Sequence, residues 1–313
     1  MSFIYLRLFG CMLATTFPLM ARRTAEETAV DLTFEIALKP VLPAHPDPPV
    51  YVSPFRDRDG EARACFFRSA GQEILRFSHA GDFLIGTDRI EAYLEGARLD
   101  LAELRFLGPV MSYWFERQGL PTLHASAAAV NGRAVAFVSR HGGGKSGLAA
   151  AMVQAGFPLL TDDLLVLEER EGGWEARPAY PEMRMWPDEA AHFVGPPEAL
   201  PPVQDGSEKR RVAIGDGGFG SFLDASTPLA CIYLASRRPE GDGGGIEIQP
   251  VSRSEALIEL VRHSFSPRLV EAAGLQPARL DRLARLVRAV PVRRLVYPSG
   301  FERLPEVVRL LRQ

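Results

Sequence analysis

The residues of this chain most able to do chemistry fall in two short clusters. One is a glycine-rich loop that ends in a cation and a hydroxyl: Gly142, Gly143, Gly144, Lys145, Ser146 and Gly147. The other is a pair of neighbouring carboxylates, Asp162 and Asp163. A glycine-rich turn into a helix offers backbone N–H groups and the positive end of the helix dipole to an anion. The lysine then reaches terminal phosphates, while the serine and a carboxylate hold Mg²⁺, so the pattern predicts a site for ATP and Mg²⁺.

The elements that must position these residues are a strand, a loop, a helix and a second strand. Ala134 to Val138 is a short apolar run that predicts a buried strand, and Leu148 to Gln154 predicts a helix that a glycine ends. Phe157 to Leu160 predicts the next strand, which places both carboxylates at its carboxyl end. A strand before the loop and a helix after it form the context that this motif requires.

The loop departs from the G-x-x-x-x-G-K-S pattern at one position, because Ser139 stands where the first glycine is expected. A serine can make this turn if its backbone angles are ordinary. Lysine is rare among the 36 basic residues and occurs only at Lys39, Lys145 and Lys209. A lysine within this loop therefore indicates that a compact point charge is needed there.

The stretch from Leu123 to Glu168 resembles the catalytic domain of the HPr kinase/phosphorylase family, bacterial P-loop serine kinases, and especially its shorter relatives found beside peptide-modifying genes. The resemblance rests on five residues: His124, Lys145, Ser146, Asp162 and Asp163. The intervals from His124 to Lys145 and from Lys145 to Asp163 match those of the family.

The resemblance implies an α/β fold with a P-loop kinase domain of the HPr-kinase/PEP-carboxykinase type. It implies that Ser146 and Asp162 hold Mg²⁺, that Asp163 accepts the proton of the attacking hydroxyl, and that His124 orients this carboxylate or the incoming phosphate. From the residues alone, the two aspartates can exchange roles. Glu182, close to Arg184, stands where the family carries an acidic magnesium ligand and is a further candidate for the metal site.

The implied activity is ATP-dependent transfer of phosphate to a serine of HPr or of a ribosomally made precursor peptide. Two alternatives remain open: a nucleotide-binding regulator without transfer activity, and a small-molecule kinase or carboxykinase-like enzyme. Homo-oligomerisation also stays open. Lys209 heads a basic cluster before the glycine-rich segment 215–220, so a lid could carry a cation to the phosphates.

Length and composition indicate two domains. With 313 residues, 46% hydrophobic and 24% charged, we expect a β-rich α+β domain over residues 1–117 and a P-loop kinase domain over 118–313. A net charge of −3 gives no case for a nucleic-acid partner. The three cysteines share no metal or redox spacing. Arg7 interrupts the apolar N-terminus, so we expect neither a signal peptide nor a membrane span, and a cytoplasmic location.

In the first half of the chain, short strands are expected at 3–9, 32–38, 64–67, 73–77 and 82–85, helical turns at 90–94 and 99–106, and a buried aromatic helix at 106–119. His45 and His79 are interpreted as surface or turn residues.

In the second half, strands are expected at 229–235 and 292–297, and helices at 254–263, 277–289 and 305–311. Ser254 is expected to cap the first of these helices. In the second, an arginine row at 279, 282, 285 and 288 is expected to face solvent, and Leu280, Leu283, Leu286 and Val287 the core.

Overall fold

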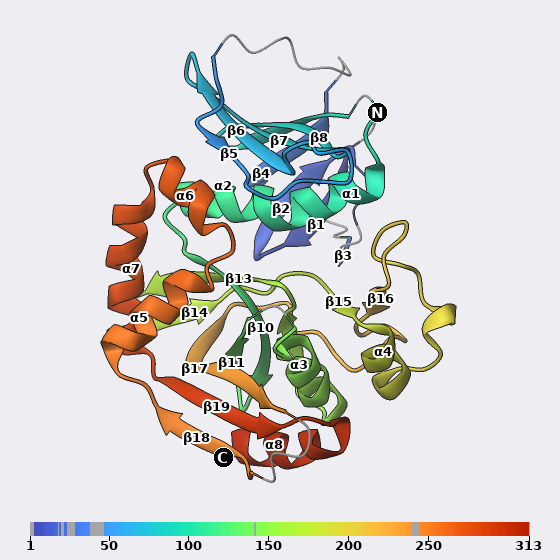
Figure 1. Cartoon of the computed structure of the whole chain (residues 1–313), viewed down its shortest axis with the longest axis vertical. Helices are drawn as coiled ribbons and strands as arrows, with labels where there is room; N and C mark the ends of the chain where they lie inside the picture. The colour runs from blue at the N-terminus through green and yellow to red at the C-terminus, as the bar shows by residue number, and fades with distance from the viewer. Residues whose placement is uncertain are drawn as a thin grey trace. The chain divides into compact units, whose positions relative to one another are not determined.

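The computed structural model in Figure 1 describes residues 3–17, 19, 22–23, 29–37, 47–94, 96–140, 142–239 and 244–312. The chain is a mixed α/β protein with several sheets. It divides into two compact units, the first comprising Met1–Gln118 with Ser266–Gln276 and the second Gly119–Phe265 with Pro277–Gln313. Over the described residues, no helix is both long enough and apolar enough to cross a membrane.

The first unit is built on a sheet that has nine strands within its described part, in the order β3-β1-β2-β4-β9-β8-β7-β6-β5. The strands are β1 (Ile4–Leu8), β2 (Cys11–Thr15), β3 (Arg22–Arg23), β4 (Leu32–Ile36), β5 (Tyr51–Val52), β6 (Ala64–Ser69), β7 (Gln72–Phe77), β8 (Gly81–Ile85) and β9 (Arg89–Tyr93). The expected strands of this half are confirmed. The helical turn expected at 90–94 is wrong, because Ile90 and Ala92 alternate inward with period two and pair with β8.

Three consecutive helical segments belong to the same unit and contribute aromatic side chains to its core. It consists of α1 (Leu99–Arg105), the π-helical turn η1 (Phe106–Val110) and α2 (Met111–Arg117). Phe106 stacks on Phe34 with 3.6 Å between ring centroids, which confirms a buried aromatic helix here. Pro109 lies inside the π turn, because its missing N–H prevents a regular α-helical bond.

The helix α6 (Pro267–Ala272) also belongs to the first unit although it comes from late in the chain. Its C-terminal neighbour Ala273 accepts a hydrogen bond at 3.1 Å from Nη2 of Arg68 in β6. His79 is half exposed in a turn with a φ of 59°, and its Nε2 lies 3.3 Å from Asp57 and 3.1 Å from Asp59. The prediction of a turn histidine is therefore confirmed, whereas His45 lies outside the described residues.

The second unit contains an eight-stranded sheet, counted over its described residues. Its strands are β10 (Thr122–Val130), β11 (Arg133–Val138), β12 (Leu159–Thr161), β13 (Leu164–Arg170), β14 (Gly173–Ala176), β17 (Thr227–Arg238), β18 (Glu247–Pro250) and β19 (Val292–Pro298). The strands β11, β17 and β19 are parallel neighbours. A separate hairpin pairs β15 (Glu182–Met185) with β16 (Arg210–Ala213).

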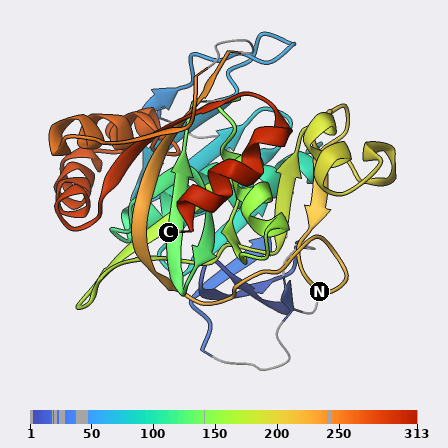
Figure 2. The ribbon, with the colours of Figure 1, turned by 90° about the horizontal axis from the view of Figure 1, so that it is seen from below.

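Helices cover both faces of this sheet. They are α3 (Lys145–Gln154), α5 (Arg253–Arg262), α7 (Gln276–Ala289) and α8 (Leu304–Leu311), with the short turn η3 (Phe301–Arg303) before α8. The helix α4 (Pro187–Phe193) packs instead against the β15–β16 hairpin, α3 and the turn η2 (Pro197–Ala199). Ala134, Ala136 and Val138 of β11 pack with α5 and α7, whereas Val135 and Phe137 pack with α3 and α8. Figure 2 shows α8 beside α3, on the face opposite α5 and α7. The sheet is therefore buried on both sides, as the apolar run of β11 predicts.

Two details of the C-terminal helices differ from expectation. Ser252, not Ser254, caps α5, since its Oγ accepts the Glu255 N–H at 3.3 Å. In α7 the apolar face is rotated: Leu280 is 38% exposed, while Arg279 is only 1% exposed and donates from Nη2 to the Thr122 carbonyl at 3.2 Å. The arginine row is thus not a uniform solvated face.

Candidate functional site

The glycine-rich loop joins β11 to α3 through glycines that adopt left-handed angles. Gly142 has a φ of 75° and Gly144, the residue before α3, a φ of 91°. Ser139 is not among the described non-glycine residues with a positive φ, so a glycine is not needed there for the turn. A Cβ on Gly143 would lie 2.7 Å from the Ser139 Cβ, so serine at the first position requires glycine at this one.

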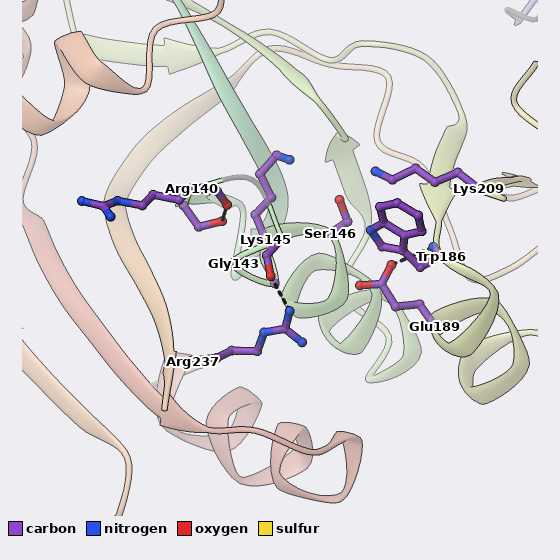
Figure 3. Close-up of a pocket in the computed structure, with 11 residues that line it drawn as sticks. Arg140, Gly143, Lys145, Ser146, Trp186, Glu189, Lys209 and Arg237 are labelled. Atoms are coloured by element: carbon purple, nitrogen blue, oxygen red, sulfur yellow. Dashed lines mark hydrogen bonds between the residues drawn. The ribbon is translucent and has the colours of Figure 1, made fainter. Parts of the chain in front are cut away.

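Lys145 opens α3 and is 8% exposed. Its ammonium group makes no ion pair or hydrogen bond with any residue that the structure describes. Lys145 lines the loop pocket, so its ammonium group is available to an anion that binds there. Figure 3 shows Trp186, Glu189 and Lys209 on the Ser146 side of the loop pocket and Arg140 directed to the opposite side.

Asp162 is held rigidly beside the serine of the loop. Its Oδ1 accepts hydrogen bonds from Ser146 Oγ at 2.9 Å and Ser126 Oγ at 2.6 Å, and its Oδ2 accepts from the backbone N–H of Arg184 at 3.0 Å. Octahedral Mg²⁺ with oxygens at 2.0–2.1 Å places adjacent ligands about 2.9 Å apart. The Ser146 and Asp162 oxygens therefore already have the spacing of two neighbouring Mg²⁺ ligands, and the residues present fit this ion.

Asp163 follows at the turn between β12 and β13 and has a φ of 86°. Its Oδ1 lies 3.0 Å from Nδ1 of His124, and its Oδ2 lies 3.3 Å from Nη1 of Arg184. Burial raises the pKa of this carboxyl, but the hydrogen bond and charge of His124, with Arg184 and Lys145, outweigh burial and hold the pKa well below its usual range. The site thus keeps a second, ionised carboxylate next to Asp162 at the cost of an unfavourable backbone conformation.

Glu182 is connected to Asp163 through Arg184. It is buried, its Oε2 lies 3.3 Å from Nη1 of Arg211, and its Oε1 lies 3.7 Å from Nε of Arg184. Arg184 thus lies between Glu182 and Asp163. Two guanidinium groups neutralise Glu182, and Arg184 connects it to Asp163.

Several site residues were not predicted from the sequence. Ser126, like Ser146, donates a hydrogen bond to Oδ1 of Asp162. Tyr180 Oη accepts a hydrogen bond from Nη2 of Arg184 at 2.8 Å. Arg237, at the end of β17, donates from Nη2 to the Gly142 carbonyl (Figure 3). A signal for Arg237 was available, because the carboxyl end of a strand parallel to β11 must lie near the loop.

Lys209, the first residue of the basic cluster, lines the loop pocket with its ammonium 5.1 Å from the centre of the Trp186 ring. Arg211 of the same cluster instead binds Glu182 and is buried. Of these two cations, Lys209 lines the pocket at the glycine-rich loop and Arg211 does not.

Two further cavities border the loop. One, of about 160 Å³, lies beside Gly144 and Gly147 and is walled by Tyr297, Phe301 and Leu304. The other, of about 420 Å³, borders Ser139, Arg140, Gly142 and Gly143 and extends to α5 and β19.

No protein-family model matches this chain, and no curated protein sequence matches it. One solved structure similar to it is the HPr(Ser) kinase/phosphatase from Coxiella burnetii, with 12% sequence identity and a TM-score of 0.29 over 61% of this chain and 93% of that chain.

Proposed function

We propose that the chain is an ATP-dependent kinase, carried by residues 118–313, that transfers the γ-phosphate to a serine of a peptide or small protein. The observation that carries this proposal is the grouping of Lys145, the Ser146–Asp162 oxygen pair and the ionised Asp163 around the start of α3. Among the described residues, the Lys145 ammonium has no ion-pair or hydrogen-bond partner. A phosphate chain, Mg²⁺ and an incoming hydroxyl require these three kinds of group.

The loop binds the phosphates. In this proposal the backbone N–H groups of Gly142 and Gly144 bind the anion at the N-terminus of α3, and Gly147 continues the first turn of the helix. The Gly143 N–H donates to the Arg140 carbonyl at 2.8 Å, so Gly143 shapes the turn in this structure. Lys145 neutralises the terminal phosphates. Ser146 and Asp162 would hold Mg²⁺, which when bound supplies charge neutralisation to the phosphates.

The acceptor hydroxyl is oriented by Asp163. As the acceptor oxygen forms its bond to the γ-phosphorus, the bond from that phosphorus to the ADP oxygen breaks, and the hydroxyl proton passes to Oδ of Asp163. His124 and Arg184 hold this carboxylate from two sides, which fixes its direction. A carboxylate with a lowered pKa is a weak base, but phosphoryl transfer depends mainly on positioning and charge neutralisation.

The identity of the acceptor is part of the proposal. HPr and a serine-bearing precursor peptide are the two acceptors to test first. The test is transfer of labelled γ-phosphate from ATP in the presence of Mg²⁺ to each of them. We expect label on serine with the unmodified chain and none with Lys145→Ala. Tight ATP binding without label on any acceptor would instead favour a nucleotide-binding regulator.

A further inference from the structure

The cavity of about 420 Å³ beside the loop has a distinctive lining, and we call it the arginine cavity. Three arginines from three different elements line it: Arg140 from the loop, Arg237 from β17 and Arg294 from β19. Leu234 and Ala235 also line the cavity and are apolar. Guanidinium groups that converge on a partly apolar cavity favour binding of a carboxylate or a phosphate.

The one carboxylate among the lining residues is Glu259, and it does not neutralise these arginines. Its Oε1 lies 2.7 Å from Nη1 of Arg262, and its Oε2 lies 3.6 Å from Nε2 of His263. Arg237 binds the Gly142 carbonyl and Arg294 pairs with Glu255, which hold these two side chains in place. Arg140 makes no ion pair with a residue in the described part of the chain. Glu255 balances the charge of Arg294, so the net positive charge that a bound anion can use comes mainly from Arg140 and Arg237.

The wall of this cavity is connected to the reacting groups. The backbone carbonyl of His263, a lining residue, accepts a hydrogen bond from the His124 N–H at 2.8 Å. The side chain of His124 in turn contacts Asp163 at 3.0 Å. His124 therefore links the cavity wall to Asp163 through its backbone and its side chain, and Figure 3 shows Arg140 of the cavity directed away from the side of the loop on which Lys209 lies.

We propose that the arginine cavity binds an anionic group of the acceptor and so selects serines that carry a carboxylate or phosphate nearby. This inference rests on the proposed kinase function. The shared chemistry is an anion bound by guanidinium groups. Its sources are an acidic side chain next to the serine, the free C-terminal carboxylate of a peptide that ends in serine, or a neighbouring phosphorylated residue.

The test uses the full chain and matched pairs of short peptides, each with a single acceptor serine. One pair carries Glu or Gln after the serine, one ends in serine with a free or an amidated C-terminus, and one carries phosphothreonine or threonine after the serine. We expect kcat/KM to favour the anionic member of at least one pair by about tenfold, since charge-assisted bonds of this kind exceed neutral ones. Equal values within all three pairs would overturn the inference.

Variants assign the preference to the cavity. In the double variant Arg140→Gln with Arg294→Gln, we expect the preference to fall toward one. The control is Arg133→Gln, an exposed arginine at the opposite end of β11, which should keep the preference. A preference that survives in the double variant, or an equal loss of kcat/KM on both members of a pair, would contradict the inference.

Measuring peptide binding separately from phosphate transfer distinguishes failure of the arginine-cavity proposal from failure of the kinase proposal. If no short peptide is phosphorylated, titration calorimetry of the same pairs with ADP and Mg²⁺ present must show tighter binding of the anionic member to the unmodified chain than to the double variant. Equal binding overturns the cavity assignment. Transfer to a serine without any preference leaves the kinase proposal standing, whereas selective binding without transfer to any acceptor would remove the kinase proposal alone.

Discussion

Ser146 Oγ and Asp162 Oδ1 lie 2.9 Å apart although 16 positions separate the two residues in the chain. Ser126 and the Arg184 N–H fix the carboxylate from its other sides. The protein itself thus holds the two oxygens at a hydrogen-bond distance that is also compatible with two neighbouring ligands of Mg²⁺.

Ser146→Ala tests this pair. We expect the affinity for ATP to fall by at least about tenfold when Mg²⁺ is present and to change little in EDTA, because the serine hydroxyl acts through the ion. Calorimetric titration under both conditions measures the effect. Ser254→Ala, at an exposed serine of α5, is the control and should change neither value. An equal loss with and without Mg²⁺ would mean that Ser146 only shapes the loop.

The backbone of Asp163 gives a prediction about stability. At a φ of 86°, alanine is strained and glycine is not, so Asp163→Gly should be more stable than Asp163→Ala by about 1 kcal/mol. Asp162 does not have a positive φ, so the order should reverse there, with Asp162→Ala more stable than Asp162→Gly. Urea unfolding of the four variants measures both differences. The same order at both positions would contradict a left-handed Asp163.

Gly144 and Gly156 share a φ of +91° but differ in their surroundings. A Cβ on Gly144 would lie 2.3 Å from Oη of Tyr297, whereas one on Gly156 would have nothing within 4 Å. We expect Gly156→Ala to cost about 1 kcal/mol of folding free energy and to leave ATP binding intact. Gly144→Ala should cost more folding free energy than Gly156→Ala and should abolish ATP binding. In the double variant Gly144→Ala with Tyr297→Phe, part of the lost stability and ATP binding should return, because the Tyr297 Oη that the new Cβ would contact is absent. Thermal unfolding and ATP titration measure these effects. Equal losses in Gly144→Ala and Gly156→Ala would mean that the contact with Tyr297 is unimportant.

The lowered pKa of Asp163 predicts a pH dependence of stability. Since the pKa is lower in the folded chain than the unfolded value of about 3.9, ionised Asp163 stabilises the fold above that pH, and this contribution is lost as the pH falls toward the folded pKa. The unmodified chain should therefore lose more unfolding free energy than Asp163→Asn between pH 7 and about pH 3. Parallel pH profiles for the two chains would show that His124 and Arg184 do not lower this pKa.

Much of the second unit could be predicted because local pattern and tertiary structure agree there. The apolar run before the loop is β11, the small-residue run is α3, and both helix ends are marked by glycine. The aspartate pair also follows from pattern, because Leu159–Thr161 is a buried strand that ends at Asp162.

The rest depends on contacts that no local pattern contains. Arg279 was predicted to face solvent because arginine usually does, but it reaches the Thr122 carbonyl across more than 150 positions of sequence. Ser126 lies in an alanine-rich strand and gains its role only when β12 pairs with β10 and brings Asp162 to it. The arginine cavity likewise needs three distant elements, so its residues could not be grouped from the sequence.

The most direct measurement of the central claim is single-turnover transfer of labelled γ-phosphate from ATP and Mg²⁺ to an acceptor serine, compared between the unmodified chain and Asp163→Asn. Asparagine tolerates the left-handed backbone and keeps the shape of the side chain but cannot accept the proton. We predict unchanged ATP affinity and a transfer rate reduced by at least about a hundredfold in the variant. Transfer at the unmodified rate with Asp163→Asn, or no transfer with the unmodified chain to any serine, would contradict the account.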